Sequence, residues 1–364
     1  MKKISELNLM AVSLLKNLIS TPSFSKEEDR TADIIQKFLG GQNISYHRLK
    51  NNVFAYNKAF DPSKPTILLN SHHDTVKPNP GYTRDPFTPI INEGKLYGLG
   101  SNDAGGCLVS LLATFLYYHD TKALKYNLCF AATAEEEISG VNGMELFVKE
   151  SAKIHTLGQH LEDFAIIGEP TQMQMAVAEK GLLVLDCIAR GQAGHAAREE
   201  GINALYLALE DINWIKNHTF DKVSPFLGPV KMTVTSIHTE NKAHNVVPES
   251  CSFVVDIRVN ELFTFAEILD ILQQNLTSEI KPRSKRLRST MISENHPVVI
   301  AGKNIGKSVY GSPTTSDKAL VGIPALKIGP GDSARSHTAD EYIYIHEIKE
   351  GIRDYITIVG SLIN

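Results

Sequence analysis

The stretch Leu128-Cys-Phe-Ala-Ala-Thr-Ala134 forms a short apolar run, and three glutamates, Glu135-Glu136-Glu137, follow it directly. A run of this kind is typical of a buried strand in a parallel sheet. Adjacent carboxylates repel one another, and a lone triplet is most often a solvated acidic turn. A bound metal is the other interpretation, with one glutamate as ligand and its neighbour as the base toward a metal-bound water. The other strand ends of the chain favour the metal.

Polar residues follow apolar runs at several further points. The apolar run 66–70 is followed by His72, the run 128–134 by Glu136 and Glu137, the run 164–167 by Glu169, and the run 325–328 by His337. Asp103 precedes a helix predicted over residues 107–119, which joins two of these strands in a βαβ unit. Because ligands bind at the carboxyl edge of the strands in open α/β sheets, we expect these side chains to converge there.

The residue types suit a pair of metal ions. His72 and Asp74 are separated by one residue, so on a strand end both side chains point to the same side. Asp74 can then hold the ring nitrogen of His72 that does not bind the metal. Asp103 can bridge two cations because a carboxylate has two oxygens. Two histidines and three carboxylates suit zinc, with cobalt or manganese as substitutes, and two metals ~4 Å apart that share a water form a hydrolytic site.

Length and composition limit the possible classes. At 364 residues two domains are expected, and 42% hydrophobic with 21% charged residues is ordinary for a soluble globular protein. The net charge of -4 gives no reason to expect a nucleic acid or an anionic membrane as a partner. We see no signal peptide and no apolar stretch long enough to span a bilayer. The four cysteines are scattered, which favours reduced thiols in a cytoplasmic protein.

The middle of the chain has a different rhythm. It predicts strands over residues 182–189, 230–237, 251–259 and 284–289, and helices over residues 202–216 and 265–276. This order, βαββαβ, is the ferredoxin-like arrangement. We therefore predict an α/β fold with a mostly parallel sheet in a discontinuous catalytic domain, residues 1–178 and 293–364. The inserted ferredoxin-like domain is predicted over residues 179–292.

Five motifs, in the right order, are similar to those of a known family. They are His72-x-Asp74-Thr-Val, Gly100-Ser-Asn-Asp103, Glu135-Glu136-Glu137, Gly168-Glu169-Pro-Thr and Ser336-His337-Thr-x-x-Glu341-Tyr. Over essentially its whole length the chain resembles the co-catalytic zinc aminoacylase and carboxypeptidase family. Its members include acetylornithine deacetylase, succinyl-diaminopimelate desuccinylase and carboxypeptidase G.

The resemblance implies two zinc ions per chain and a role for each residue of the constellation. The implied ligands are His72 and Glu169 for one zinc, Glu137 and His337 for the other, and Asp103 as the bridge. Glu136 is the implied general base, and Asp74 supports His72. The family's base motif usually starts with aspartate, where this chain has Glu135, so a shift of base and ligand by one position is the alternative register. A cis peptide bond between Asp103 and Ala104 is also implied.

The same resemblance implies residues that contact the substrate. The segment Gly191-Gln-Ala-Gly-His195-Ala is similar to a loop whose histidine reaches into the partner subunit's active site. His195 is therefore expected to stabilise the oxyanion across a homodimer. Asn245 and Arg258 match positions that contact the substrate carboxylate. The remaining substrate-binding candidates are Lys180, Thr315 and Gly329, the last two in loops that line the acyl and amino-acid pockets.

The implied reaction is hydrolysis of the amide bond of an N-acyl amino acid, with Glu136 taking a proton from water and returning it to the departing amine. Glu179 falls where desuccinylases tend to carry a basic residue, and a glutamate there suits a cationic ornithine-like side chain. N-acetylornithine in arginine biosynthesis is therefore the first candidate substrate. Succinyl-ornithine, acetylcitrulline, succinyl-diaminopimelate, a carrier-linked amino acid and a dipeptide are the alternatives. A protein of the same fold that binds its ligand without catalysis is the alternative from a different functional class. Absence of a metal ligand or of the general base from the sequence would indicate it.

Overall fold

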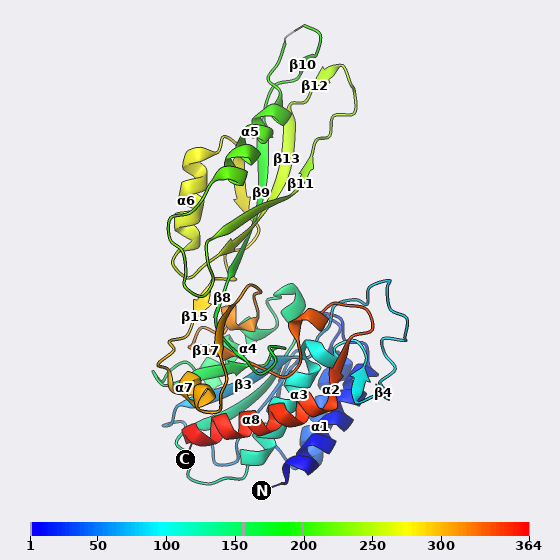
Figure 1. Cartoon of the computed structure of the whole chain (residues 1–364), viewed down its shortest axis with the longest axis vertical. Helices are drawn as coiled ribbons and strands as arrows, with labels where there is room; N and C mark the ends of the chain where they lie inside the picture. Colours follow the sequence, from blue (N-terminus) through cyan, green and yellow to red (C-terminus); the bar gives the residue numbers. More distant parts are fainter. Residues whose placement is uncertain (1, 155–156, 199, 364) are drawn as a thin grey trace. The chain divides into compact units, whose positions relative to one another are not determined.

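Two units make up the computed structural model, which describes residues 2–154, 157–198 and 200–363 (Figure 1). Unit 1 comprises Met1–Val177, Ile292–Tyr310 and Ser316–Asn364, and unit 2 comprises Ala178–Met291 and Gly311–Thr315. The outer bounds of unit 2 differ by one residue from those predicted for the inserted domain. The segment Gly311–Thr315 was predicted in the catalytic domain but belongs to unit 2. Two hydrogen bonds explain this, because Lys180 N donates to Ser312 O at 3.2 Å and Thr315 Oγ1 donates to Lys180 O at 2.9 Å.

A nine-stranded sheet has its central strands in unit 1 and runs in the order β1-β2-β6-β3-β7-β17-β8-β15, with β16 paired to β8. By the bounds above, β15 and the last residues of β8 and β16 are counted in unit 2. The four central strands, β6, β3, β7 and β17, run parallel, and the outer pairings are antiparallel. The strands are β1 (His47–Leu49), β2 (Asn52–Tyr56), β3 (Thr66–His72), β6 (Asn127–Thr133), β7 (Phe164–Ile167), β8 (Met175–Glu179), β15 (Thr290–Met291), β16 (Val309–Ser312) and β17 (Ala325–Lys327). Every residue of β3, β6 and β7 is buried, which explains their continuous apolar sequences.

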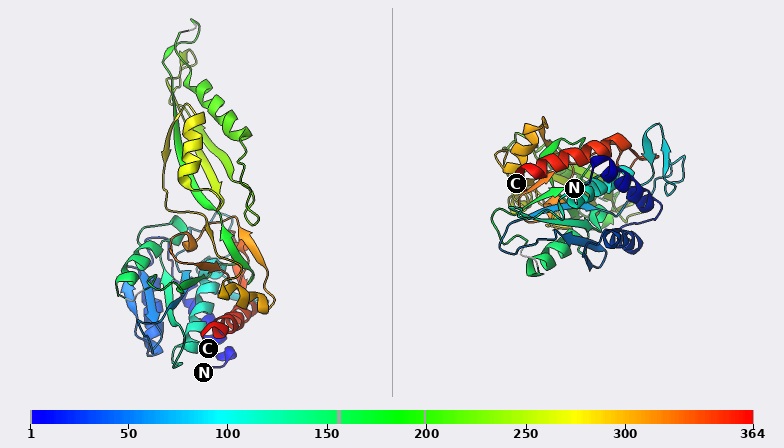
Figure 2. Two further views of the ribbon diagram at one scale, coloured as in Figure 1. Left: turned by 90° about the vertical axis from the view of Figure 1, so that its left-hand side faces the viewer. Right: turned by 90° about the horizontal axis from the view of Figure 1, so that it is seen from below.

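Helices cover both faces of this sheet (Figures 1 and 2). On one face α3 packs against α1 and α8, and α7 also packs against α8; on the other face lies α4. The helices of unit 1 are α1 (Ile4–Ile19), α2 (Asp29–Gly41), α3 (Gly106–Tyr118), α4 (Met144–Ile154), α7 (Pro297–Asn304) and α8 (Ile345–Ile363). Phe147 of α4 meets Phe54 of β2 edge to face, with ring centroids 5.2 Å apart. The buried side chains of both layers fix the strands and thereby the loops at their carboxyl ends.

A small antiparallel sheet, β18-β5-β4, adds to unit 1 and is formed by β4 (Ile90–Asn92), β5 (Lys95–Tyr97) and β18 (Tyr342–Tyr344). The strand β8 leads out of unit 1 beside the returning chain. Ile292 N donates to Val177 O at 2.8 Å, and the buried ammonium of Lys318 donates to Val177 O at 2.9 Å and to Ala176 O at 3.2 Å. The departing and returning segments are therefore hydrogen-bonded neighbours.

Unit 2 has the predicted βαββαβ order and a four-stranded antiparallel sheet, β11-β13-β9-β14. Its elements are β9 (Gly181–Arg190), α5 (Ala204–Asn217), β11 (Lys231–His238), β13 (Ser250–Val259), α6 (Phe265–Asn275) and β14 (Glu279–Pro282). The helices α5 and α6 cover one face of this sheet, where alternate apolar residues of β9 and β13 form the core (Figure 1). A two-stranded ribbon, β10 (Gly194–His195) with β12 (Val246–Val247), carries His195.

The last strand of unit 2 was predicted over residues 284–289, and this prediction is wrong. The strand is β14, Glu279–Pro282, in which Ile280 lies opposite Cys187 of β9. The basic and polar residues that follow alternate as in a strand, but they form a loop whose Leu287 O accepts a hydrogen bond from Leu182 N at 2.9 Å. The strand forms where Ile280 can pack against the core of the sheet, and the alternating polar and basic pattern of residues 284–289 is not sufficient to form one.

Candidate metal centre

The carboxyl ends of three neighbouring parallel strands carry most of the predicted metal ligands. His72 is the last residue of β3 and lies opposite Thr133, the last residue of β6. The 3₁₀ turn η2 (Glu136–Ile138) follows β6 after two residues, and Glu169 follows β7 after one. Asp103 lies in the turn η1 (Ser101–Gly105) before α3, and His337 follows the turn η4 (Ser333–Arg335) beyond β17. The structure therefore brings together all five predicted ligands and the predicted base.

The side-chain atoms of these residues form two overlapping groups. His72 Nε2 lies 3.3 Å from Asp103 Oδ1, 3.8 Å from Glu169 Oε1 and 4.0 Å from Glu136 Oε2. His337 Nε2 lies 2.9 Å from Glu137 Oε2 and 3.6 Å from Asp103 Oδ2. Each oxygen of Asp103 thus faces a different histidine, which is the geometry that a bridging carboxylate requires. Atoms of two triplets, His72 with Asp103 and Glu137, and His72 with Glu136 and Glu169, lie within 4.8 Å of one another.

The electrostatics of this group fit a bound cation. Burial raises the pKa of Glu136 well above its usual range, and the Glu169 and Asp317 carboxylates add to the rise while His72 opposes it. Burial also raises the pKa of Glu137. Hydrogen bonding to Glu137 raises the pKa of His337 to about 9. Without a metal ion, the negative charge of the clustered carboxylates favours protonation of Glu136, Glu137 and His337. A metal ion bound by their nitrogen and oxygen atoms would supply the positive charge in place of these protons.

Asp74 holds the glutamate turn through its carboxylate. Oδ1 accepts a hydrogen bond from Glu136 N at 3.0 Å, and Oδ2 accepts one from Glu137 N at 3.2 Å and one from Ser25 Oγ at 2.7 Å. The same carboxylate was predicted to hold the second ring nitrogen of His72, and it forms an ion pair with that nitrogen. His72 Nδ1 lies 3.0 Å from the backbone oxygen of Asp74 and 3.5 Å from Asp74 Oδ1. The backbone oxygen is therefore the closer partner, because the carboxylate is turned toward the two amides.

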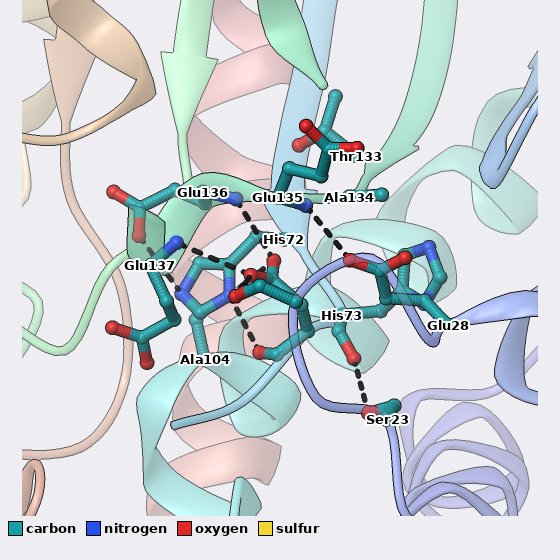
Figure 3. Close-up of polar contacts among 12 residues, drawn as sticks. Ser23, Glu28, His72, His73, Ala104, Thr133, Ala134, Glu135, Glu136 and Glu137 are labelled. Atoms are coloured by element: carbon teal, nitrogen blue, oxygen red, sulfur yellow. Dashed lines mark hydrogen bonds and ion pairs between the residues drawn. The ribbon is translucent and has the colours of Figure 1, made fainter. Parts of the chain in front are cut away.

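A second buried carboxylate, that of Glu28, holds the first residue of the triplet. Glu28 Oε1 accepts a hydrogen bond from Glu135 N at 3.1 Å (Figure 3). It also accepts one from Lys26 N at 2.6 Å. Glu135 has a left-handed backbone with φ 57°, and its own carboxylate accepts from Asn142 Nδ2 at 2.9 Å. Glu135 is thus a turn residue that faces away from the ligands, and three successive amides of the triplet donate to buried carboxylates. Sequence reasoning did not include Glu28 among the site residues and missed this contact.

A third buried carboxylate, that of Glu341, holds the loop of Asp103. It accepts hydrogen bonds from the backbone N–H groups of Gly100 at 3.1 Å, Asn102 at 2.8 Å and Asp103 at 2.9 Å. Burial, together with the Asp103 carboxylate, raises the pKa of Glu341 to about 8. The peptide bond between Asp103 and Ala104 is cis, as predicted. Glu341 belongs to the motif that follows His337, and that motif was the signal that pointed to it.

The predicted substrate contacts divide between the two units. In unit 2, His195 is exposed and its Nδ1 accepts a hydrogen bond from Ala197 N at 3.1 Å, while Asn245 O accepts one from Ala196 N at 3.0 Å. His195 and Asn245 therefore lie in neighbouring loops. Because Nδ1 of His195 accepts a hydrogen bond, Nε2 is the nitrogen of this imidazole that carries the proton when the ring is neutral.

The remaining candidates in unit 2 are Lys180, Thr315 and Arg258. Lys180 Nζ donates to Pro229 O at 3.0 Å, and Arg258 forms a two-point ion pair with Asp256, at 2.8 and 3.0 Å. Thr315 bonds to the backbone of Lys180, as described above.

Gly329 lies in unit 1, packed against the backbone of the proposed metal ligand Glu169. Its O accepts from Met173 N at 2.8 Å and its N donates to Thr171 Oγ1 at 3.0 Å. A Cβ at this position would lie 2.5 Å from Glu169 O, which explains the glycine by close packing. The residue is buried, so the structure gives it a role in placing Glu169.

Comparison with known proteins identifies the family. The model of peptidase family M20/M25/M40 matches residues 68–360. The chain belongs to this family. The predicted resemblance is confirmed, and this M20 chain is accordingly a metal-dependent hydrolase.

Three relatives illustrate the range of activities. Acetylornithine deacetylases of Proteus mirabilis (strain HI4320) and Shigella sonnei (strain Ss046) are 29% and 30% identical to this M20 chain. The first comparison covers 91% of each chain, and the second covers 93% of this chain and 94% of the relative. A succinyl-diaminopimelate desuccinylase of Orientia tsutsugamushi (strain Ikeda) is 24% identical, over 96% of this chain and 87% of the relative.

Solved structures confirm the predicted α/β fold of this M20 chain. An aminopeptidase of Bacillus cereus ATCC 10987 superposes with a TM-score of 0.77 at 16% identity, over 98% of each chain. A dinuclear metal-binding peptidase of family M20 from Bacillus subtilis superposes with a TM-score of 0.71 at 14% identity, over 98% of this chain and 99% of that chain. Within the described residues, no helix is long and apolar enough to cross a membrane.

Proposed function

We propose that this M20 chain binds two zinc ions and hydrolyses the amide bond of an N-acyl amino acid. The observation that carries this proposal is the position of Asp103, whose oxygens lie 3.3 Å from His72 Nε2 and 3.6 Å from His337 Nε2. One carboxylate between two histidines, each with a further glutamate, supplies donors for two cations. The M20 peptidase of Bacillus subtilis, whose fold this chain shares, is a dinuclear metal-binding protein, which supports the pair.

The proposed roles follow from the contacts. One ion would be held by His72 and Glu169, the other by Glu137 and His337, and Asp103 would contact both. When bound, the ions supply a water of lowered pKa and polarise the amide carbonyl. The Glu136 carboxylate is the proposed proton acceptor, because its Oε2 lies 4.0 Å from His72 Nε2, whereas Glu137 is bonded to His337 at 2.9 Å. As the proton acceptor, Glu136 would take a proton from water and return it to the leaving amine.

The amino-acid part of the substrate is proposed to be ornithine-like, and N-acetylornithine is the first substrate to test. Two relatives with at least nine-tenths of their length covered are acetylornithine deacetylases, which supports a place in arginine biosynthesis. Glu179 does not support this choice of substrate, because the residue is 0% exposed and its carboxylate is not available to a ligand. A cytoplasmic location is part of the proposal and is supported by the four buried, free cysteines.

We further propose that the working unit is a homodimer that forms through unit 2. The strand β11 lies at the edge of its sheet, and α5 packs beside it. On α5 the side chains of Tyr206 and Leu209 are 65% and 48% exposed, and Ile237 of β11 is 45% exposed. An open strand edge beside exposed apolar side chains is suited to pairing with a second copy about a two-fold axis. The exposed His195 would then serve the neighbour's site.

The experiment that tests the reaction is a turnover panel with zinc-loaded protein. The panel contains N-acetylornithine, N-succinylornithine, N-acetylcitrulline, succinyl-diaminopimelate and simple dipeptides, with release of the free amine as the readout. We expect hydrolysis of an N-acylornithine, loss of activity with a chelator and its return with zinc. A protein that holds metal but turns over none of these compounds would point to a binding role on the same fold.

A further inference from the structure

The two histidines of the proposed metal centre differ in how their rings are held. His72 is buried, and its Nδ1 lies 3.0 Å from Asp74 O. The side chain of His337 is 54% exposed, and no group in the part of the chain that the structure describes forms a hydrogen bond with its Nδ1. A ligand histidine is ordinarily oriented through the ring nitrogen that does not bind the metal. The orientation of His337 therefore depends on its backbone.

The backbone of His337 lies in a turn that begins at Arg335. His337 has a left-handed conformation with φ 58°. Thr338 Oγ1 donates to Arg335 O at 2.8 Å, so the arginine and the threonine close the turn around the histidine. Asn79 Nδ2 also donates to His337 O at 3.1 Å, but this contact is exposed. A shift of Arg335 would thus move His337 with it.

The side chain of Arg335 ties this turn to a helix. Its two terminal nitrogens donate to the two carboxylate oxygens of Glu347 at 2.7 and 3.0 Å, and both side chains are largely buried. A two-point pair of this kind fixes direction as well as distance. Glu347 lies in the first turn of α8, where a helix favours a carboxylate, and α8 packs against α3 and α1. The turn of His337 is therefore attached to the packed core of unit 1.

Two tyrosines of β18 hold the same guanidinium group. Cζ of Arg335 lies 4.8 Å from the ring centroid of Tyr342 and 5.2 Å from that of Tyr344. The two tyrosines are two residues apart on the strand, so their side chains lie on the same side. Tyr344 N also donates to Glu347 Oε2 at 3.0 Å. The strand, the arginine and the helix therefore form one connected cluster, in which an arginine both stacks and pairs.

We propose that Arg335 is a positioning residue for His337 and sets the affinity of one of the two metal ions. Arg335 acts through the turn and contributes no donor atom of its own. This inference rests on the proposed function, in which His337 is a ligand of one ion. His72 and Glu169, the proposed ligands of the other ion, lie at the ends of β3 and β7 and do not depend on this turn. An arginine that served only the fold would not affect one ion selectively.

The test measures the affinity of each ion by calorimetric titration of the metal-free, full-length protein with zinc. In Arg335→Met we expect the affinity for one ion to fall about 10–100-fold and that for the other to stay as in wild type. Glu347→Gln keeps the arginine but removes the charge of its partner, so it should weaken the same ion. Arg335→Lys should recover only part of the lost affinity, because an ammonium group cannot form the two parallel bonds.

The matched control is Lys307→Met. It removes an ion pair of 2.6 Å between another largely buried cation and Asp354 of the same helix, about two helical turns beyond Glu347. The urea midpoint of the metal-free protein reports what the loss of each ion pair costs in stability. Lys307→Met should leave both metal affinities as in wild type, whatever its urea midpoint.

A reference variant, His337→Ala, identifies the affected ion. It should lose the ion that Arg335→Met weakens, and adding Arg335→Met to it should not weaken the remaining ion further. Loss of an ion in His337→Ala, with wild-type affinities in Arg335→Met and Glu347→Gln, would overturn this inference alone. Equal weakening of both ions in Arg335→Met would also overturn it. Retention of both ions in His337→Ala would overturn the proposed ligand assignment and this inference with it.

Discussion

The carboxylate of Asp74 accepts a hydrogen bond from the backbone N–H of Glu136 at 3.0 Å, and its other oxygen accepts one from the next amide, that of Glu137, at 3.2 Å. A single buried side chain thus orients the proposed base and a proposed metal ligand together. The bonds run to the backbone, so they fix the direction in which both glutamates leave the turn.

We expect Asp74→Asn to lower both metal affinity and kcat by ~10–100-fold. The amide group can accept from one of the two N–H groups but presents its own N–H₂ to the other. Chelator competition measures metal affinity, and steady-state turnover measures kcat. Ser25→Ala is the matched control, since it removes the third bond to Asp74 and leaves both backbone bonds. Wild-type affinity and turnover in Asp74→Asn would show that the two bonds do not position the site.

Glu136→Gln and Glu137→Gln should give different phenotypes. The first removes the proposed proton acceptor, so it should retain both metals and lose ~10²–10⁴-fold in kcat. The second removes a carboxylate that lies 2.9 Å from His337, so it should weaken one of the two metals. Metal content and turnover of the same preparations decide the point. Swapped phenotypes would place the base one position further along the triplet.

The protein should bind two metal ions per chain. Five donors exceed the four of a single tetrahedral site, and Asp103 presents one oxygen to each histidine. Elemental analysis of protein purified without chelator and then equilibrated with excess zinc measures the ratio. Saturation at one ion per chain would contradict the two-metal site.

Two inactive variants should restore activity when they exchange subunits. In a mixed dimer of His195→Ala with Glu136→Gln, one site receives both defects and the other receives neither if His195 serves the partner. Equal mixing makes half of the dimers mixed, so about a quarter of wild-type activity should return. Mass spectrometry confirms the exchange. A fully exchanged mixture without activity would show that His195 acts within its own chain or that no such dimer forms.

The start of α6 should make the stability of unit 2 depend on pH. Thr264 N and Thr264 Oγ1 donate to Glu267 Oε2 at 2.7 and 2.9 Å, and Lys222 Nζ donates to its other oxygen at 3.0 Å. These bonds, led by the backbone bond from Thr264, lower the pKa of Glu267 from 4.5 to about 2. Because the folded pKa is the lower one, this stabilisation is complete above pH 4.5 and is lost as the pH falls toward 2.

The difference in urea midpoint between wild type and Glu267→Gln should therefore be largest near neutral pH and should shrink below pH 4.5. Asp270→Asn, which changes an exposed carboxylate of the same helix outside the cap, is the control. A difference that stays constant from pH 7 to 3 would mean that Glu267 acts through packing alone.

Strands that are buried on both sides could be predicted because their sequences leave no alternative. The apolar runs before His72, Glu136 and Glu169 are β3, β6 and β7, and the polar residue after each run lies in the metal centre. The carboxyl edge of a parallel sheet explains why a one-dimensional pattern sufficed for the ligands.

The contacts that hold the ligand loops could not be predicted. Glu28 and Glu135 are separated by 107 residues, and nothing near Glu28 in the sequence marks it as an acceptor for a distant amide. The substrate argument from Glu179 has a related weakness, since it matched this position to one that is basic in desuccinylases, and such a match does not reveal that the side chain is buried. Both depend on long-range packing, which a single sequence does not record.

The paired segments where the chain leaves and re-enters unit 1 have a consequence for the history of such proteins. Glu179 lies opposite Thr290 and Ala178 opposite Met291, so the whole intervening segment begins and ends at hydrogen-bonded neighbours. In topological terms it is an enlarged hairpin loop. A short turn could join the two paired strands in place of the intervening segment. Such a turn would cost little chain entropy and would leave the strand order of the central sheet unchanged. Such a junction allows an ancestral hydrolase to gain, lose or exchange its second module while its metal-binding framework stays intact.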